Sequence, residues 1–497
     1  MPGDDDYRNA IMFATACLRG GNVPKAVEKI AELKCLLIDE IQDLVGPRAD
    51  FVLEVAARVR ANGNTVCVLG DPAQAINDYQ VKSGGTTTEA FLEKMREILG
   101  ESRRAYSFSK PYRYNTQKMK DFVSELRTSM GRDGVNPDMP RLSEAVSEVQ
   151  TKALASLVQF RDQVKRDNKT AAILTRRNLQ AWEVVDYCRR NEIDDSDVTL
   201  QGGAGGGWPS WLARVFARWN QEFMRKDRFR DKWNEQVGDL CGLTWAEAWA
   251  RAELAEVCDG NTGVDLIELR RRVKHQGAPR NDSESVLTVS TIHKSKGLEF
   301  DRVLLLEPDR NLTRDEARIL YVAATRGRET LELLEKPAGF RKSRIKLKHD
   351  YDNSKGKWRL LLVNGKELDK RSLVMPDGYS TLEMQKIQDV LWGYVQGKTY
   401  AQRFEVSRTG NGGYALQIPA EGDRPTVAVC KMKEGLSEDL QELQKYQSGG
   451  VTRGNCEVSE LETVAFDERD EEATKQFGRA GLALAPVLEG YLEVKSG

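Results

Sequence analysis

The sequence CLLIDEIQD at residues 35–43 joins a short apolar run to an acidic end. Residues 35–38 are all apolar, and Asp39 follows them directly. A pattern typical of a helix occupies residues 51–59, and a second apolar run lies at residues 66–69. Because these runs lack the polar alternation of a half-exposed strand, we expect strands buried on both faces, as in a parallel sheet covered by helices. The stretch therefore predicts an α/β fold.

The same order of apolar run and helical pattern returns later in the chain. Further apolar runs occur at residues 171–174, 286–291, 303–306 and 331–334. Between the last two, a predicted helix carries one apolar stripe made of Ala317, Leu320, Tyr321 and Ala324. We therefore expect two α/β units, divided within residues 106–115.

The chain changes character outside these units. A glycine run at residues 202–207 introduces helical patterns rich in Trp and Arg, and segments beyond residue 335 favour short strands and turns. A predicted helical face made of Leu212, Phe216, Trp219 and Phe223 is expected to pack in a core, whereas the basic side chains of residues 225–232 could face nucleic acid. We predict an incomplete first domain (1–105), a second domain (106–190 and 286–335), a helical insertion (191–285) and a C-terminal α+β accessory domain of unknown role (336–497).

The composition excludes several classes of protein. Lys and Arg number 75 against 76 Asp and Glu, so a net charge of −1 excludes a uniformly basic nucleic-acid binder but permits local basic grooves. Three histidines and the lack of a Cys-x-x-Cys pair argue against a His-based metal site or a zinc knuckle. The first residues lack signal-peptide features, and no apolar run approaches the ~20 residues that cross a bilayer. We therefore expect a cytoplasmic protein without a membrane partner.

Polar side chains follow the first two apolar runs, at the sheet edge where parallel α/β folds bind ligands. Asp39 could hold Mg²⁺ through water, and Glu40 could orient an attacking water. Gln74, after the second run, could sense a γ-phosphate or position that water. Taken singly, each segment is more often an acidic turn or a Gly-Asp-Pro turn at a strand end.

The most unusual string is TIHKSKGLEF at residues 291–300. It places a hydroxyl, an imidazole, two lysines and a glycine in one loop, which could touch nucleic-acid phosphate on one side and a ribose on the other. Tyr112 and Arg113 could stack an adenine and bind phosphate, and Arg326 at a helix end could act as an arginine finger. The alternatives are a charged surface loop, a chance Tyr-Arg pair and a cation that complements the helix dipole.

Six strings occur in one order along residues 35–335: DEIQD, LGDPAQAIND, PYRYN, TAAILTRRN, TIHKSKGLEF and LYVAATRGR. Together they resemble motifs II, III, IV, IVa, V and VI of UvrD/Rep-type superfamily-1 DNA helicases. The resemblance implies two RecA-like parallel-sheet domains with ATP between them and single-stranded DNA running across both. It also implies an ATP-dependent helicase or translocase that moves 3′ to 5′ along that strand.

Carried over motif by motif, the resemblance implies a role for each candidate residue. Asp39 would bind Mg²⁺ and Glu40 would activate water, while the γ-phosphate would be read by Gln74, Arg113 and Arg326. The remaining nucleotide contacts would be Tyr112 on the adenine, Glu299 on the ribose, and Gly297. Single-stranded DNA would meet Tyr79, Thr291, His293 and Lys294.

The sequence departs from this family in two places. Asn77 and Gln80 stand where the family usually has an aromatic residue and an arginine, so the usual coupling of DNA contact to ATP contact is not carried over. Only 38 residues precede Asp39, and none forms a P-loop; the later string at 393–399 has three residues between its glycines where four are needed. A truncated sequence, a split helicase whose P-loop lies on a separate chain, and a catalytically inactive DNA-binding remnant all fit this pattern.

Overall fold

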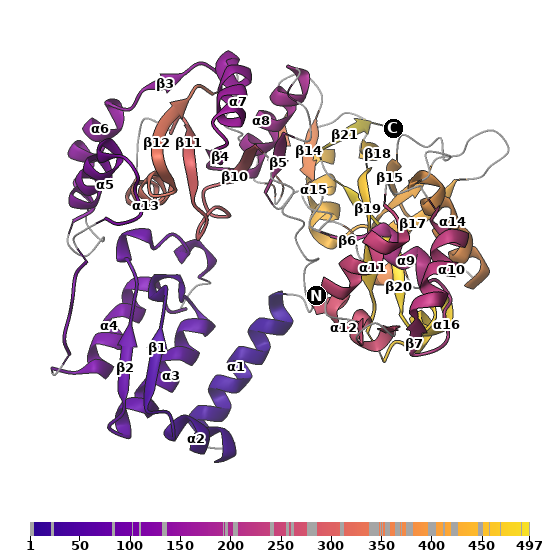
Figure 1. Ribbon diagram of the computed structural model, residues 1–497, viewed down its shortest axis with the longest axis horizontal. Coiled ribbons are helices and arrows are strands. Elements are labelled where there is room, and N and C mark those ends of the chain that lie inside the picture. Colours follow the sequence, from indigo (N-terminus) through magenta and orange to yellow (C-terminus); the bar gives the residue numbers. More distant parts are fainter. Residues whose placement is uncertain are drawn as a thin grey trace. The chain divides into compact units, whose positions relative to one another are not determined.

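The computed structural model describes most of the chain as two compact units (Figure 1). The motif unit consists of residues 2–201 and 285–337, and the accessory unit of residues 202–284 and 338–497. The described residues are 4–20, 24–81, 85–101, 103–108, 111–131, 137–191, 193, 197–201, 207–238, 243–254, 258–259, 263–275, 286–308, 313–336, 347, 349, 351–352, 358–362, 368, 370–373, 381–395, 404–410, 413–418, 426–445, 451–456, 458–467, 469–488 and 490–496. Most of the glycine run (202–206) and the Gly-Lys-Thr string (397–399) lie outside them.

The second half of the motif unit is built on a six-stranded sheet in which every pair is parallel. Its order is β3 (Thr151–Lys152), β12 (Gly327–Leu334), β11 (Phe300–Leu306), β4 (Ala171–Thr175), β10 (Leu287–Thr291) and β5 (Val198–Leu200). All residues of β4 are buried, as expected of a central strand with helices on both faces. The predicted α/β class and the predicted strands of this half are confirmed.

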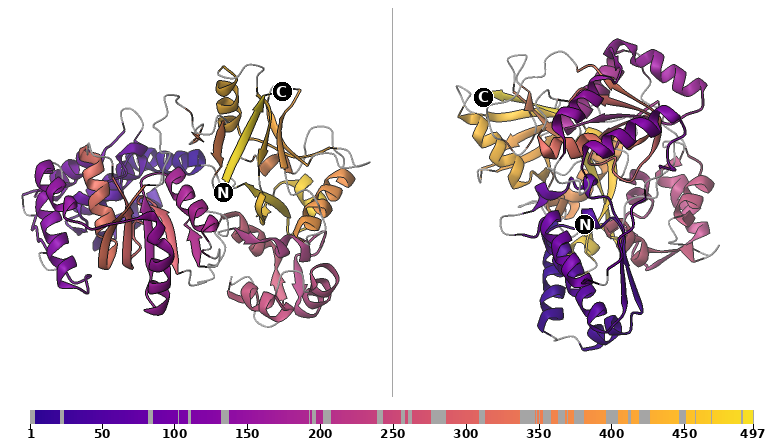
Figure 2. Two further views of the ribbon diagram at one scale, coloured as in Figure 1. Left: turned by 90° about the horizontal axis from the view of Figure 1, so that it is seen from above. Right: turned by 90° about the vertical axis from the view of Figure 1, so that its left-hand side faces the viewer.

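Helices cover both faces of this sheet (Figure 2). One layer contains α5 (Gln117–Ser129), α6 (Met139–Ser147) and α13 (Arg314–Ala324), and the other contains α7 (Leu157–Arg166) and α8 (Asn178–Arg190). A capping box starts α13: the Thr313 hydroxyl accepts from the Glu316 N–H, and the Glu316 carboxylate accepts from the Thr313 N–H. The predicted stripe of this helix, from Ala317 to Ala324, is buried.

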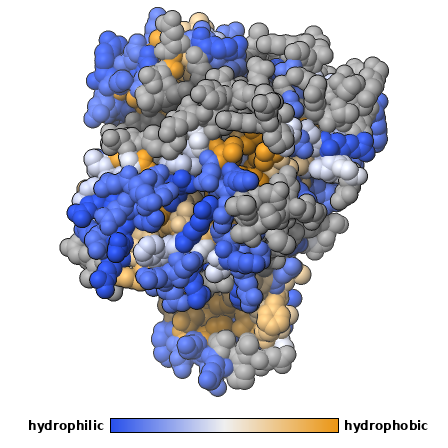
Figure 3. All heavy atoms as spheres, turned by 90° about the vertical axis from the view of Figure 1, so that its right-hand side faces the viewer, coloured by the Kyte–Doolittle hydropathy of each residue, from blue (hydrophilic) through white to orange (hydrophobic). Residues whose placement is uncertain are grey.

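The first half of the motif unit has a smaller parallel sheet of β1 (Cys35–Ile38) and β2 (Thr65–Val68). Its helices are α1 (Asp4–Gly20), α2 (Pro24–Ala31), α3 (Pro47–Ala61) and α4 (Thr88–Leu99). Ile38 packs with α3 and α4, but Leu37, which points to the opposite face, remains 62% exposed. Burial on both faces was therefore a wrong expectation for β1, because the helices that pack on this sheet cover the Ile38 face. Figure 3 shows an apolar patch toward the lower end of the face that it draws.

The accessory unit combines the predicted helical insertion with the predicted accessory domain around one core. A seven-stranded antiparallel sheet runs in the order β13 (Tyr351–Asp352), β14 (Arg359–Leu362), β21 (Gly490–Ser496), β18 (Val451–Cys456), β15 (Phe404–Arg408), β16 (Tyr414–Ile418) and β17 (Val427–Lys431). Two smaller sheets contain β20 (Leu482–Leu488), β19 (Val458–Ala465) and β6 (Trp208–Pro209), and β7 (Phe223–Arg225), β9 (Gly263–Asp265) and β8 (Cys258–Asp259). The helices are α9 (Ser210–Val215), α10 (Lys226–Gln236), α11 (Trp245–Leu254), α12 (Leu266–His275), α14 (Thr381–Val395), α15 (Glu434–Gln444) and α16 (Glu471–Phe477).

The aromatic residues of α10 belong to this core. Phe229 and Trp233 are buried, and Lys226 lies over the ring of Trp249. The predicted core role of Leu212 and Phe216 is confirmed, but it is wrong for Phe223, which is 36% exposed, because the helix ends at Val215 and Phe223 begins β7. A nucleic-acid role for the basic residues of α10 stays a prediction. Among the described helices of both units, none combines the length and apolar content that a membrane crossing requires.

Candidate nucleotide and nucleic-acid site

The turn after β1 carries the first two candidate residues. Glu40 has a left-handed backbone (φ 50°, ψ 44°), which is uncommon for a residue with a side chain. The Gln42 side-chain amide N–H donates to the Glu40 carboxylate at 2.5 Å, and the Gln42 side-chain oxygen accepts from the Asp71 backbone N–H at 3.0 Å. The buried Gln42 thus ties the ends of β1 and β2 together, while Asp39 and Glu40 remain exposed.

Gln74 ends the short helix η2 (Pro72–Gln74), which follows β2. Asp71 receives hydrogen bonds from the Ala73 N–H (3.1 Å) and from the Gln74 side-chain amide (3.2 Å). The Tyr321 hydroxyl, on α13, donates to the same carboxylate at 3.0 Å. Burial, and then the charge of Asp71, raise the pKa of Tyr321, so this hydroxyl stays protonated. Asp71 therefore connects the first half of the unit to α13.

Arg326 lies two residues beyond the end of α13 and is buried. Its guanidinium donates to the Gln74 side-chain oxygen at 3.2 Å and to the backbone carbonyls of Leu298 and Val322, each at 3.1 Å. Burial lowers the pKa of Arg326, and Arg113 lowers it further. The contact with Val322 matches the helix-end alternative, and the contact with Gln74 joins two candidates for the γ-phosphate.

Arg113 and Glu299 form an ion pair with 2.6 Å between Nε and Oε1. Both side chains are partly exposed, and the Arg328 guanidinium lies 3.8 Å from the other oxygen of Glu299. Tyr112 is 80% exposed. The residue predicted to bind the ribose and a residue predicted to bind phosphate are therefore paired with each other.

The loop after β10 carries the other predicted contacts. Gly297 has φ 83°, a left-handed conformation that favours glycine. His293 packs edge-to-face on Tyr79, with 5.2 Å between ring centroids, and Tyr79 is 70% exposed. Thr291 is buried and its hydroxyl accepts from the Lys294 N–H at 3.4 Å, so Thr291 shapes the loop from inside.

The structure thus brings the candidates together in two groups. Arg326, Gln74, Arg113 and Glu299 are linked by contacts and charge, and Glu40 also acts electrostatically on Arg326. Tyr79 and His293 form the second group. Asp39 meets the first group only through the Glu40 N–H, which donates to its Oδ1 at 2.8 Å. These positions do not test the predicted roles, which stay predictions.

The carboxylate of Asp39 suits a magnesium ion that takes its other ligands from a nucleotide and water. Within the described part of the chain, no group of three or more His, Cys, Asp or Glu could hold a metal ion. Asp39 nevertheless offers an exposed carboxylate at a strand end. Mg²⁺ is commonly held by one or two carboxylates, substrate phosphates and water, so Asp39 would hold it together with a nucleotide.

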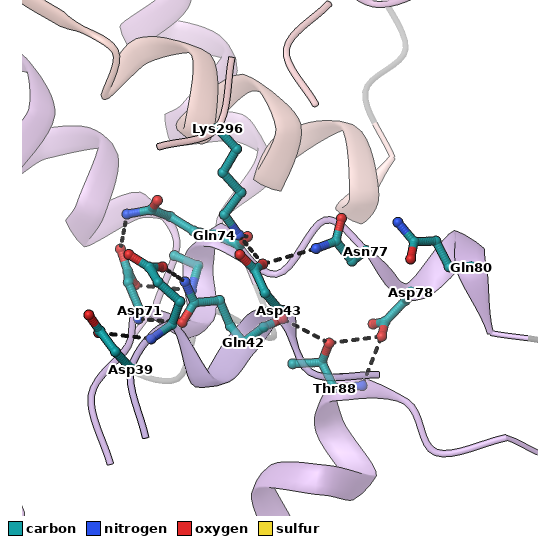
Figure 4. A network of polar contacts seen from close by, with 12 residues as sticks. Asp39, Gln42, Asp43, Asp71, Gln74, Asn77, Asp78, Gln80, Thr88 and Lys296 are labelled. Carbon is teal, nitrogen blue, oxygen red and sulfur yellow. Dashed lines mark hydrogen bonds and ion pairs between the residues drawn. The ribbon is translucent and has the colours of Figure 1, made fainter. Parts of the chain in front are cut away.

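Several connecting residues were not predicted from the sequence. Asp71 and Tyr321 join β2 to α13, and Asp43 and Lys296 form an ion pair across the two halves (Figure 4). Each lies inside a motif string, where charged or hydroxyl side chains were the available signal. Tyr321 was interpreted only as part of an apolar stripe.

Comparisons with known proteins agree with the fold of the second half. Residues 287–334 match the family model of the UvrD-like helicase C-terminal domain. The C-terminal domain of a possible DNA helicase from Lactobacillus plantarum WCFS1 is similar at 13% identity, covering 46% of this chain and 88% of that chain; its TM-score of 0.22 carries no argument. No curated protein matches the chain. The resemblance to UvrD-type helicases is therefore confirmed over residues 287–334, where the chain is similar to the UvrD-like helicase C-terminal domain.

Proposed function

We propose that the chain is part of an ATP-dependent DNA helicase or translocase of the UvrD type that moves 3′ to 5′ on single-stranded DNA. The hydrogen bond between Arg326 and Gln74 carries the proposal. It joins Gln74, which follows the carboxyl end of β2, to Arg326, which lies between α13 and β12. A guanidinium and an amide in contact there can bind oxygens of one phosphate group. The family match over residues 287–334 supports the same function.

In the proposed reaction, water attacks the γ-phosphorus of ATP, the bond to the bridging oxygen breaks, and ADP and phosphate leave. Glu40 would orient the water and accept its proton, and Arg113 and Arg326 would stabilise charge on the γ-phosphoryl oxygens. A bound Mg²⁺ at Asp39 would neutralise phosphate charge. Since Glu299 holds Arg113 in the structure, nucleotide binding would release Arg113 toward phosphate as Glu299 turns to the ribose.

Single-stranded DNA is the proposed track. Tyr79 offers an exposed ring supported by His293, and stacking of one base on an aromatic side chain is worth about 1–3 kcal/mol. Lys294, whose ammonium lies 3.3 Å from the Gln201 carbonyl, and the exposed Arg176 are the proposed phosphate contacts. Burial lowers the pKa of His293, and Arg176 lies close enough to lower it further, which places the Arg176 charge near the two rings.

The open face of β1 favours a second candidate, a nucleotide site completed by another polypeptide. Parallel sheets are normally covered on both faces, yet Cys35 is exposed, Leu37 is 62% exposed and Leu69 is 38% exposed. The 497 residues also contain no Gly-x-x-x-x-Gly-Lys-Thr or Gly-x-x-x-x-Gly-Lys-Ser string. We therefore propose that a segment carrying the P-loop covers this face and supplies the phosphate cradle beside Asp39.

Steady-state ATP hydrolysis, with and without oligo-dT, tests the proposal. The chain alone should turn over ATP more slowly than ~1 s⁻¹, the low end of ordinary enzymes, because it lacks the phosphate cradle. When a separate UvrD-type polypeptide that carries the P-loop is added to the chain, the mixture should hydrolyse ATP, and DNA should stimulate this hydrolysis. In that mixture, Glu40→Gln should bind ATP and lose at least ~10²-fold in turnover.

Two outcomes contradict parts of this account. If the Glu40→Gln variant hydrolyses ATP at the rate of the parent chain, Glu40 does not activate water and is only an acidic residue at a strand end. DNA binding without hydrolysis in every mixture would favour the inactive DNA-binding remnant.

A further inference from the structure

A polar network at the centre of the motif unit involves residues with no role in the proposed chemistry (Figure 4). Asp43 ends the short helix η1 (Ile41–Asp43), and its Oδ1 accepts from the Asn77 side-chain amide at 3.0 Å. The Lys296 ammonium pairs with the same oxygen and also donates to the Gln74 carbonyl at 2.8 Å. Lys296 is only 12% exposed. One carboxylate therefore holds three segments that are far apart in the sequence.

This network holds both sides of the Tyr79–His293 pair. Asn77 immediately precedes η3 (Asp78–Gln80), the short helix that carries Tyr79. Lys296 lies three residues after His293 in the same loop, and the Ile76 backbone lies close enough to the His293 ring to affect its pKa. The loop that carries His293 and Lys296 thus lies against the segment that carries Asn77 and Tyr79, and Asp43 contacts both.

The far side of η3 is fixed as well. Asp78 accepts from the Thr88 N–H at 2.8 Å and from the Thr88 hydroxyl at 2.9 Å. Arg318 of α13 lies 3.9 Å from the other oxygen of Asp78. Two successive residues at the start of η3 are therefore held: Asn77 by Asp43, and Asp78 by Thr88 and Arg318.

The identity of residue 77 gains a physical reason from this contact. Asn77, which stands where the resembling helicases usually have an aromatic side chain, offers a short amide donor that reaches Asp43 at 3.0 Å. The residue that departs from the family is therefore the one that contacts the carboxylate.

We propose that Asp43 is a positioning residue for nucleic-acid binding, which joins Asn77 to Lys296 and so keeps Tyr79 and His293 together as a stacking surface for a base. The inference rests on the proposed binding of single-stranded DNA. Lys296 then acts by holding the loop, since its ammonium is directed to Asp43 and the Gln74 carbonyl, and Lys294 and Arg176 supply the phosphate contacts.

Fluorescence anisotropy of fluorescein-labelled oligo-dT with the full chain tests the proposal. Asp43→Asn removes a negative charge, so electrostatics alone would strengthen DNA binding. Loss of positioning should instead weaken binding by about 5- to 30-fold, part of the effect of one stacked base. The slope of log Kd against log salt should stay unchanged, because no phosphate contact is lost. The Asp43→Glu variant keeps the negative charge and should therefore retain most of the wild-type affinity, unlike Asp43→Asn.

A matched control and a second variant separate the outcomes. Glu329→Gln removes the carboxylate that pairs with Lys169 at 2.6 Å in the same unit, and should leave DNA affinity within about twofold. Asn77→Ala retains the Asp43–Lys296 pair and should also weaken binding. If the wild-type chain binds oligo-dT and folded Asp43→Asn or Asn77→Ala binds equally or more tightly, the positioning role is overturned and the proposed function stands. No binding by the wild-type chain at low salt would overturn the proposed function itself.

Discussion

The Arg326 guanidinium lies 3.2 Å from the side-chain oxygen of Gln74, although 252 positions separate the two residues in the sequence. The contact joins the end of β2 to the end of α13 within the motif unit. A protein that binds one phosphate group with side chains from two sheets needs an arginine and an amide from those sheets in contact with each other. The arrangement also makes Arg326 important for stability, apart from any chemistry.

Arg326→Ala should destabilise the motif unit by about 2–4 kcal/mol, because it empties a buried site, takes the donor from the Leu298 carbonyl and leaves the Val322 carbonyl with only the Thr325 hydroxyl. Urea unfolding measures the change. Arg190→Ala is the control, since Arg190 is exposed and pairs with Asp186 only at the surface; it should change stability by less than about 0.5 kcal/mol. Equal stabilities of the two variants would contradict the buried network around Arg326.

Much of the motif unit could be predicted from the sequence because its strands and helices obey local patterns. The uninterrupted apolar run at residues 171–174 became the fully buried β4, and the stripe from Ala317 to Ala324 became the buried face of α13. The family resemblance assigned Gln74 and Arg326 to one γ-phosphate, and the two side chains lie in contact, although this contact does not test that role.

The rest depends on contacts that sequence periodicity does not encode. Leu37 has the apolar neighbours of a central strand, yet its exposure depends on which helices cover β1. Asp71 and Asp43 looked like strand-end or turn residues, and only the folded chain places Tyr321 and Lys296 against them. The insertion and the C-terminal region share one core because distant segments pack together, which no local pattern shows.

Gly70→Ala should destabilise the motif unit by about 1–3 kcal/mol. A Cβ at residue 70 would lie 2.3 Å from the Gln42 side-chain oxygen and 2.5 Å from the Ile41 Cγ2, so the turn that holds Glu40 would have to move. Gly410→Ala is the control, because nothing lies within 4 Å of a Cβ there. Urea denaturation of both variants provides the measurement, and an unchanged midpoint for Gly70→Ala would be inconsistent with the tight turn.

Cys35 should react with a maleimide much faster than Cys188 in the folded chain. Cys35 is exposed on β1, whereas Cys188 is buried in α8 and burial raises the pKa of its thiol to about 11. The thiolate is the reactive form, so Cys188 should label only after denaturation. Peptide mass spectrometry after timed labelling reports each site. Similar rates at the two cysteines would contradict the open face of β1, and protection of Cys35 by an added P-loop polypeptide would support its occupation.

His293→Gln should reduce the loss of stability as the pH falls below about 6.5. Burial and nearby Arg176 lower the pKa of His293 in the folded chain. As the pH falls, His293 therefore takes up a proton in the unfolded chain before it does so in the folded chain. The contribution of the neutral, buried His293 to stability is complete above the pKa of the unfolded chain and is lost as the pH falls through the lower pKa of the folded chain. Urea midpoints at pH about 7.5 and 5.5 measure the difference. The same pH-dependent loss in wild type and His293→Gln would contradict burial of this ring.

The proposed binding of single-stranded DNA is tested most directly by the affinity of the full chain for fluorescein-labelled oligo-dT. This affinity is measured by fluorescence anisotropy across a series of salt concentrations. Binding should weaken steeply with salt, because phosphate contacts release counterions. Tyr79→Ala should weaken it by about 5- to 150-fold, the equivalent of one stacked base. Tyr106→Ala is the matched control: Tyr106 is 79% exposed against 70% for Tyr79, and its loss should change affinity less than about twofold. Absence of binding at low salt, or equal effects of the two tyrosine variants, would contradict the account.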